Sequence, residues 1–472
     1  MFQVLLINPP FEFEAEATGV DHKFKNVINI VAPLGIAYVA ATLEKMQISV
    51  KIIDCATGVS YQELYRRIHQ MAPDVIGITS TTPSFSNATK VARYIKDNLP
   101  KCKILLGGAH VTAVPKLAMD LKLFDIGVIG EAELIIENLF NNFRDGQFEN
   151  LENIKGIIYL KGDEIIQNER EDFIKDLDTI AFPSRHLLPD LIKYLPTPAS
   201  ARRVPYATVM TSRGCPTRCT FCDRAIFGEK IRLRSVENIM TEIDHLVEHH
   251  GVREIRFFDD TFTINKKRTM ALCEELMSRD YKLLWTCLTK VNCVDEELLK
   301  KMKEAGCWQI LYGFESGDDR MLKILGKHTS VEKNQRAIKM TKKAGIEVRG
   351  DFILGTPGET WESLKHTLDF TLNNNLGYAH YNKFTPFPGT QLTKELEIQG
   401  YTFDLTHSSI IEHEKLHYVN PGMDPNEFLK FLDLAHRKFY LRPIYILKRL
   451  FKIRSLFQLK GQIRGFFALI RF

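Results

Sequence analysis

The sequence predicts an α/β protein in which a doubly wound parallel sheet is followed by a partial (β/α)6 barrel and a helical C-terminal extension. Short apolar runs alternate with amphipathic helices over residues 1–140, which is the pattern of a parallel sheet covered on both faces. Six further strand–helix units follow between about 205 and 395. We therefore expect a sheet domain at 1–140, a connector at 141–200, a barrel domain at 201–398 and the extension at 399–472.

The composition indicates an ordinary globular protein. Of the 472 residues, 44% are hydrophobic and 26% charged, which excludes collagen-like and wholly disordered chains. The formal net charge is +5, but residues 437–472 contain ten Lys and Arg and no acid. Subtracting those ten from the 63 basic residues leaves 53 against 58 acidic ones. Because the basic excess lies in one segment, we do not expect the protein to bind nucleic acid.

The first domain opens with an apolar strand at 4–7 that ends at Asn8-Pro9-Pro10. Further strands are expected at 50–54, 74–79, 103–106 and 125–129, separated by helices at 34–46, 61–71 and 87–98. Such sheets bind their ligands beyond the carboxyl ends of the strands. No Gly-x-Gly-x-x-Gly follows the first strand, which argues against a dinucleotide.

Small and polar residues stand at these strand ends. Gly107 and Gly108 allow the backbone to approach a large flat ligand closely. Thr79 and Ser80 add hydroxyl groups after a neighbouring strand, and Glu131 follows the last one. These five residues are therefore the candidate binding residues of the first domain.

This layout, with Gly-Gly-Ala-His-Val-Thr at 107–112 as its most characteristic part, resembles the cobalamin-binding domain. The resemblance implies that Thr79, Ser80, Gly107, Gly108 and Glu131 contact a corrinoid. The loop after the first strand lacks the Asp-x-His-x-x-Gly motif whose His lies under cobalt in that fold, so no lower axial ligand is assigned. The alternative is a flavodoxin-like domain without a ligand.

Three closely spaced cysteines carry the strongest chemical signal in the chain. Cys215, Cys219 and Cys222 follow a strand at 206–210 with the spacing Cys-x3-Cys-x2-Cys. Three thiolates on one loop can bind three irons of a [4Fe–4S] cluster and leave the fourth iron open. A structural zinc site usually needs a fourth protein ligand, and none lies nearby in the sequence. Zinc binding and a redox thiol remain alternatives, and the other six cysteines are expected to be ordinary thiols.

The cysteine loop, with Phe221 before its last Cys, resembles the signature of the radical S-adenosylmethionine (radical SAM) superfamily. In that family the open iron binds SAM, and reduction yields methionine and a 5′-deoxyadenosyl radical. The resemblance implies that the SAM contacts lie at the ends of later strands. These are Asp259 and Asp260 for the amino group, Glu315 and Ser316 for the ribose and carboxylate, and Ile353 and Gly355 for the adenine.

The order of these domains resembles the cobalamin-dependent radical SAM enzymes. The group includes methyltransferases, the anaerobic ring cyclase of chlorophyll synthesis and hopanoid-associated enzymes. The resemblance implies a [4Fe–4S] cluster, SAM, cobalamin, an external one-electron reductant of the flavodoxin or ferredoxin type, and a small-molecule or lipid substrate bound between the domains. It favours methyl transfer to an unactivated carbon through the deoxyadenosyl radical and methylcobalamin. The alternatives are an oxidative cyclase or carbon–carbon coupling enzyme acting on a lipid or tetrapyrrole, and a non-catalytic corrinoid or iron–sulfur sensor.

The location of the protein is inferred from what the chain carries. No secretory signal opens it, and nine cysteines, an odd number, favour a reducing cytoplasm. The tail at 439–472 mixes apolar residues with basic ones, a composition that suits peripheral contact with an anionic membrane at the inner face. The alternative is a helix that packs on the barrel and keeps its basic face in water.

Overall fold

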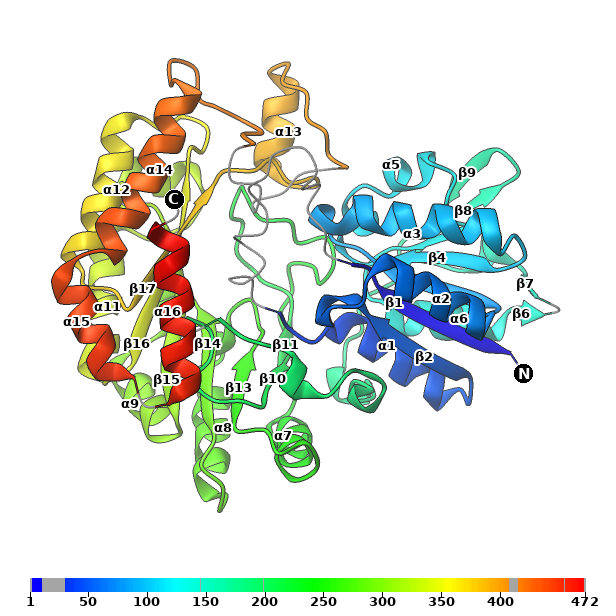
Figure 1. The fold of residues 1–472 in the computed structure, drawn as a ribbon, viewed down its shortest axis with the longest axis horizontal. Helices are drawn as coiled ribbons and strands as arrows, with labels where there is room; N and C mark the ends of the chain where they lie inside the picture. The colour runs from blue at the N-terminus through cyan, green and yellow to red at the C-terminus, as the bar shows by residue number, and fades with distance from the viewer. Residues whose placement is uncertain are drawn as a thin grey trace.

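The computed structural model describes residues 2–10, 30–144, 146–197, 199–406, 415–453 and 455–470. It contains a seven-stranded and a six-stranded sheet, which lie side by side with the barrel on the left of Figure 1. Three helices at the C-terminal end lie against the barrel side. The predicted fold class is confirmed.

The N-terminal sheet has the strand order β2-β1-β3-β4-β5-β8-β9. Its strands are β1 (Gln3–Asn8), β2 (Ser49–Asp54), β3 (Val75–Thr79), β4 (Lys103–Gly107), β5 (Ile126–Val128), β8 (Ile157–Lys161) and β9 (Glu164–Gln167). Its helices are α1 (Leu34–Lys45), α2 (Tyr61–Met71), α3 (Phe85–Asn98), α4 (Ala109–Ala113), α5 (Pro115–Asp120) and α6 (Ala132–Asn141). Because β1 lies between β2 and β3, the strand order reverses there, and the loops at that point flank the usual ligand crevice.

Both faces of this sheet are buried, as the continuous apolar strands predict. Leu5 and Ile7 pack with α2 and α3 on one face. Val4 and Leu6 pack with α1 and α6 on the other. The strands β1 to β5 are parallel, whereas β8 and β9 are antiparallel and continue the sheet beyond β5. The segment 157–167, which the sequence assigns to the connector, therefore forms a hairpin that belongs to the sheet.

The second sheet has six parallel strands in the order β10-β13-β14-β15-β16-β17. They are β10 (Tyr206–Val209), β13 (Glu254–Phe257), β14 (Leu284–Thr289), β15 (Cys307–Glu315), β16 (Glu347–Leu354) and β17 (Tyr378–Lys383). The covering helices are α7 (Val236–His250), α8 (Lys266–Ser278), α9 (Glu296–Glu304), α10 (Asp319–Ile324), α11 (Val331–Lys343), α12 (Trp361–Asn373) and α13 (Gln391–Ile398). Two short antiparallel ladders, β6 (Phe143–Arg144) with β7 (Gln147–Phe148) and β11 (Ser212–Arg213) with β12 (Arg232–Leu233), lie outside the sheets.

The extension consists of α14 (Pro425–Tyr440), α15 (Pro443–Lys452) and α16 (Leu456–Ile470). The tail packs on the barrel, and it does so through a basic residue: Arg449 is 9% exposed and bonds to Glu347 of β16 at 3.0 Å. Its guanidinium also lies 3.8 Å from the centre of the Tyr378 ring. No helix in the described part of the chain is long and apolar enough to cross a membrane.

Candidate functional site

The cysteine loop leaves β10 and places its three thiols close together. Cys215, Cys219 and Cys222 are all free, and none is fully buried. Burial, together with the negative charges of Cys219, Asp260 and Cys215, raises the pKa of Cys222 to about 12. Burial and the charges of Glu315 and Cys215 also raise the pKa of the Cys219 thiol. The three side chains are therefore electrostatic neighbours, as ligands of one cluster must be.

Cations beside the loop offset this repulsion. The charges of Lys327 and Lys290 lower the pKa of the Cys219 thiol, against the larger effect of burial. The Lys327 ammonium is held by Glu315 at 2.9 Å and lies 5.8 Å from the centre of the Phe221 ring. The structure thus brings the predicted residue Glu315 to the cysteine loop, through Lys327. Positive charge at this position stabilises thiolates, the form that binds iron.

The thiols fit a cluster rather than a single ion. Among the described residues, no three His, Cys, Asp or Glu side chains converge on a point where one metal ion could bind. A [4Fe–4S] cluster requires no such convergence because each thiolate binds a different iron. Three free, mutually close thiols with two lysines beside them meet the requirements of that cluster.

The base of the loop is fixed by Asp259. Its carboxylate accepts hydrogen bonds from the amides of Thr211 at 2.6 Å and Ser212 at 3.2 Å, and from the Thr211 hydroxyl. Arg268 donates to the Thr211 carbonyl at 2.7 Å. Asp259 is buried and engaged by the loop, whereas Asp260 is exposed beside Cys222. Contact of either carboxylate with SAM stays a prediction.

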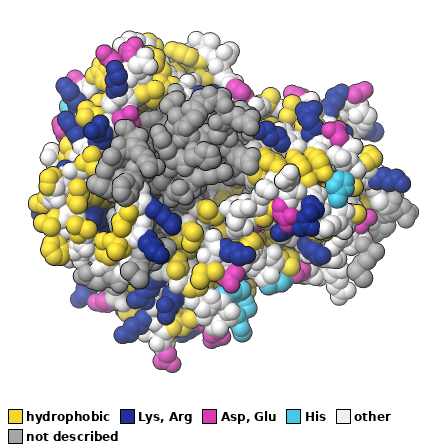
Figure 2. All heavy atoms as spheres, viewed as in Figure 1, with side chains coloured by type: hydrophobic (Ala, Val, Ile, Leu, Met, Phe, Trp, Pro, Cys, Tyr) yellow, Lys and Arg dark blue, Asp and Glu magenta, His cyan; other side chains and the backbone are white. Residues whose placement is uncertain are grey.

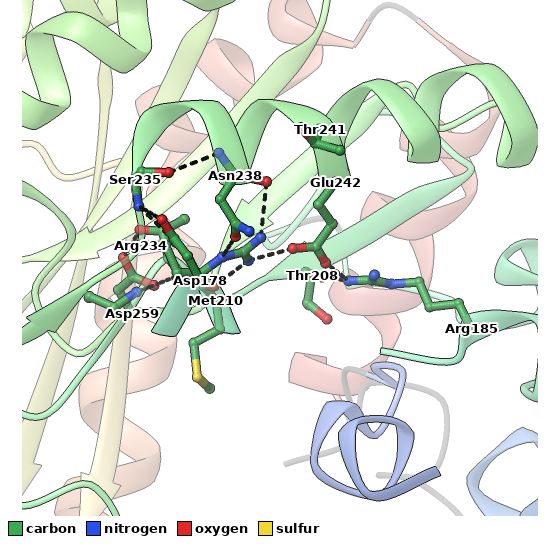
Figure 3. Close-up of polar contacts among 12 residues, drawn as sticks. Asp178, Arg185, Thr208, Met210, Arg234, Ser235, Asn238, Thr241, Glu242 and Asp259 are labelled. Atoms are coloured by element: carbon green, nitrogen blue, oxygen red, sulfur yellow. Dashed lines mark hydrogen bonds and ion pairs between the residues drawn. The ribbon is translucent and has the colours of Figure 1, made fainter. Parts of the chain in front are cut away.

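A buried ion-pair network supports the strand that leads into this loop (Figure 3). Glu242 of α7 pairs with Arg185 at 2.7 Å and with Arg234 at 2.5 Å, and it is 1% exposed. Arg185 donates to the Thr208 carbonyl at 2.8 Å, and Arg234 donates to the Met210 carbonyl at 2.9 Å. The carbonyls of Thr208, Met210 and Thr211 therefore each accept from a guanidinium, which fixes the direction of the loop.

Sequence reasoning did not single out this network. A signal for Glu242 does exist: it lies on the apolar stripe of α7, three residues after Ile239 and four before Leu246. An acid at such a position needs a buried cation as partner. The sequence does not show which cations these are, because Arg185 comes from the connector.

The remaining predicted SAM contacts occupy turns at later strand ends. The Ser316 hydroxyl is 3.1 Å from that of Thr367 and accepts from the Asp318 amide. Ile353 packs in a small apolar cluster with Leu325, Phe384, Leu392, Leu396 and Tyr418. The Gly355 amide donates to Glu359 at 2.6 Å. Gly355 has φ +81°, and a Cβ there would lie 2.7 Å from the Phe428 ring, so the turn requires glycine.

A cavity of about 230 Å³ joins the two domains. From the N-terminal domain it is lined by four of the predicted corrinoid residues, Thr79, Gly107, Gly108 and Glu131. From the barrel it is lined by Met210, Arg213, Ile226 and Phe227, which belong to or follow the cysteine loop. A ligand of the first domain would therefore touch the cysteine loop directly.

The two adjacent glycines have different surroundings. A Cβ on Gly107 would meet nothing within 4 Å, so this position leaves room for a ligand. Gly108 has φ +101°, and its Cβ would lie 2.5 Å from the Ser80 carbonyl. Ser80 itself is buried, and its amide donates to the Gly107 carbonyl at 2.9 Å. This open cradle of backbone fits a large flat ligand; the individual corrinoid contacts stay predictions.

Glu131 also joins the domains. It pairs with Arg213 at 3.2 Å and with Arg232 at 2.7 Å, and it accepts from the Ile174 amide. Arg213 pairs in addition with Glu133 at 2.5 Å. Arg213 and Glu131 are almost fully buried. The cysteine loop is therefore attached to the N-terminal domain by ion pairs between segments about 80 residues apart in the chain.

The segment after β9 also contacts both domains. Tyr194 donates to Asp54 at the end of β2 at 2.7 Å. His186 lies 2.7 Å from Glu44 of α1, and Ser184 donates to the Ala37 carbonyl at 3.0 Å. Together with the Arg185 pair to α7, these contacts hold the two sheets on either side of the cavity.

Comparison with known proteins identifies the family of the chain. The model of the radical SAM superfamily matches residues 209–371, and that of the B12 binding domain matches residues 24–140. An uncharacterized methyltransferase of Pyrococcus horikoshii is 33% identical over 98% of each chain. This chain belongs to the radical SAM superfamily. As a radical SAM enzyme with a B12-binding domain, it uses a [4Fe–4S] cluster, SAM and cobalamin, as the sequence predicts.

Other members of the superfamily are similar over most of their length. The anaerobic magnesium-protoporphyrin IX monomethyl ester cyclase of Cereibacter sphaeroides is 30% identical, covering 87% of this chain and 67% of its own. The solved structure of OxsB with aqua-cobalamin and SAM bound has a TM-score of 0.71 at 18% identity and covers 99% of this chain and 72% of its own. TsrM from Kitasatospora setae has a TM-score of 0.70 at 16% identity, covering 94% and 90%. The two structures show that the whole fold is shared.

Proposed function

We propose that this radical SAM enzyme is a methyltransferase that transfers a methyl group to an unactivated carbon of a small-molecule substrate. The observation that carries the proposal is the cavity shared by the glycine strand ends and the cysteine loop. It would hold the corrinoid against the loop that binds the cluster. The similarity to the Pyrococcus horikoshii methyltransferase and, at 29% identity, to the cytidylyl-2-hydroxyethylphosphonate methyltransferase of Streptomyces wedmorensis supports it.

When bound, the cluster with SAM supplies a deoxyadenosyl radical and the corrinoid supplies the methyl group. Cys215, Cys219 and Cys222 would hold three irons and leave the fourth open to SAM. The charges of Lys327 and Lys290 favour the thiolate form of Cys219. Arg213 fixes the loop against the first domain through Glu131 and Glu133, so the distance between the two cofactors is set by the protein. Electrons would come from an external flavodoxin or ferredoxin.

The test is an anaerobic assay of the full chain, reconstituted with iron, sulfide and hydroxocobalamin and supplied with SAM and dithionite. We expect 5′-deoxyadenosine, and S-adenosylhomocysteine that requires added cobalamin. Cys219→Ala should form no deoxyadenosine, whereas Cys102→Ala, a half-buried thiol of the first domain, should match the wild type. Deoxyadenosine without S-adenosylhomocysteine would favour the cyclase or coupling enzyme. Neither product would favour the sensor.

We also propose that α15 docks on an anionic membrane. Its buried side carries Arg449, whereas its apolar side chains are turned outward: Ile444 is 61% exposed, Leu447 54% and Phe451 71%. Figure 2 shows hydrophobic side chains gathered over this helix at the left. The exposed Lys448 lies among them. Apolar side chains that alternate with cations suit the surface of an anionic bilayer.

Co-sedimentation with vesicles tests this docking. The protein should bind vesicles that contain phosphatidylglycerol more strongly than pure phosphatidylcholine. Replacing Leu447 and Phe451 together by Ser should abolish binding, while Ile398→Ser, an 86% exposed residue of α13, should leave it unchanged. Equal binding by the double variant would contradict the proposal.

A further inference from the structure

The inner face of the barrel carries a cluster of charged side chains. Along β13, β16 and β17, residues such as Ile255, Val348 and Tyr381 point outward into the core shared with the helices. Alternate residues of a strand point to opposite faces. Arg256, Arg349, Asp351, His380 and Asn382 therefore face inward.

Neighbouring acids on this face have partners of their own. Glu254 accepts from the amides of Arg202 and Arg203 and from the Trp308 indole. Glu347 pairs with Arg449 and Lys452, and Glu315 pairs with Lys327. None of these three carboxylates is left to balance the two inward arginines.

Asp351 is the acid that does lie beside the arginines. It is 3.4 Å from Arg349 Nε and 3.9 Å from His380 Nδ1, and its register partner on β17 is His380. The Asn382 amide lies 3.4 Å from the same His380 nitrogen. One carboxylate therefore lies beside the Arg349 guanidinium and the His380 imidazole. Its charge also acts on Arg256, so the two arginines outnumber the acid between them.

Arg256 has no bonded anion among the residues that the structure describes, because Asp351 acts on it through its charge alone. It makes no hydrogen bond or ion pair with any residue that the structure describes. Its guanidinium carbon lies 5.2 Å from the centre of the Phe258 ring. Burial, followed by the charge of Arg349, lowers the pKa of Arg256 to about 10. A half-buried guanidinium beside a second one is unfavourable unless an anion joins them.

We propose that Arg256 and Arg349 bind an anionic group of the substrate, a carboxylate or a phosphate, inside the barrel. The inference rests on the proposed function only in taking the ligand to be the substrate. Guanidinium groups bind both oxyanions through paired N–H donors. Solvent reaches the cluster, because the Asp351 side chain is 26% and that of His380 51% exposed. His380 and Asn382 would bind neutral polar atoms beside the anionic group.

The test measures the unfolding temperature of the reconstituted holoenzyme with inorganic phosphate or succinate, against sodium chloride at equal ionic strength. At roughly 10 mM, one of the two anions should raise the unfolding temperature of the wild type by about 3 °C above the chloride value. The anion that acts identifies the group as a phosphate or a carboxylate. Arg256→Gln and Arg349→Gln should each lose the shift, and Arg256→Lys should keep part of it. Arg253→Gln, an exposed arginine next to β13, should retain all of it.

Circular dichroism confirms that each variant is folded, and Gln at position 256 relieves a like-charge repulsion, so the fold is expected to persist. A wild type that phosphate and succinate stabilise no more than chloride would overturn the inference. An equal shift in Arg256→Gln would overturn it as well. The proposed methyltransferase is tested separately by cobalamin-dependent formation of S-adenosylhomocysteine in the wild type, so failure of one leaves the other standing.

Discussion

The loops at the strand ends of the two sheets face the same cavity but are held in place by different forces. In the barrel, the exit from β10 is fixed by buried charge. Three arginines donate to the carbonyls of residues 208, 210 and 211, and Glu242 and Asp259 neutralise these arginines. In the N-terminal sheet, the ends of β3 and β4 are joined by backbone hydrogen bonds and a glycine with positive φ.

This difference matches what each loop has to bind. A loop that presents three thiolates must hold like charges together, and a rigid ionic base resists their repulsion. A large flat cofactor needs close approach of backbone and few side chains, which glycine provides. Arg213 connects the two loops, because it belongs to the cysteine loop and forms ion pairs with Glu131 and Glu133 of the N-terminal domain. The predictions below test each side of this comparison.

The largest loss of stability is expected in the buried ion-pair network of Glu242. Glu242→Gln leaves Arg185 and Arg234 without their shared anion, and we expect the free energy of unfolding to fall by about 3–5 kcal/mol. Urea unfolding followed by circular dichroism measures it. Glu237→Gln, exposed on the same helix, is the control and should change stability by less than about 0.5 kcal/mol. A loss no larger than the control's would show that the network does not hold the loop.

The second largest effect is expected at Arg213, which pairs with acids of the N-terminal domain. Arg213→Met should cost about 2–3 kcal/mol, because Glu133 becomes an unpaired buried charge while Arg232 still neutralises Glu131. Adding Glu133→Leu removes that charge and should recover at least half of the loss. Unfolding of the single and double variants in urea decides this. If the double variant were no more stable than the single one, the cost would lie in packing and not in charge.

The two adjacent glycines of the N-terminal domain, Gly107 and Gly108, provide a matched pair of variants. Gly108→Ala forces a side chain into positive φ against the Ser80 carbonyl and should cost about 1–3 kcal/mol of stability. Gly107→Ala should leave stability unchanged but weaken hydroxocobalamin binding about tenfold, because its methyl occupies the cavity. Spectroscopic titration with the corrinoid and thermal unfolding separate the two effects. Unchanged corrinoid affinity in Gly107→Ala would place the cofactor elsewhere.

The smallest effect is a dependence of stability on pH. Burial raises the pKa of Glu359, whose carboxylate accepts from the Gly355 and Thr356 amides, to about 7. A carboxyl with a raised pKa stabilises the fold fully below its unfolded pKa, and that contribution is lost as the pH rises through the folded pKa. Between roughly pH 5 and 8, the wild type should lose about 1–2 kcal/mol relative to Glu359→Gln. Parallel pH profiles for the two proteins would contradict this.

The sequence by itself determined the fold class and the cofactors, because their signals are local. Continuous apolar runs mark strands buried on both faces, and the Cys-x3-Cys-x2-Cys spacing fixes how many thiolates one loop presents. Of the predicted corrinoid residues, Thr79, Gly107, Gly108 and Glu131 do line one cavity. The hairpin β8–β9 lies in the segment predicted as a connector, and its pairing with β5 depends on which sheet edge is free, which is decided by the fold.

The tertiary structure decided which charges meet. Arg213 and Glu133 are 80 residues apart, and Arg449 and Glu347 are 102 residues apart. The tail shows most clearly what the sequence does not determine. Its mixture of basic and apolar residues predicts an amphipathic helix but not which side of that helix packs against the barrel. The folded chain buries Arg449 and exposes Phe451, because the buried Glu347 and the Tyr378 ring offer a guanidinium more than they offer an apolar side chain. Such partners come from distant segments, so only the folded chain reveals them.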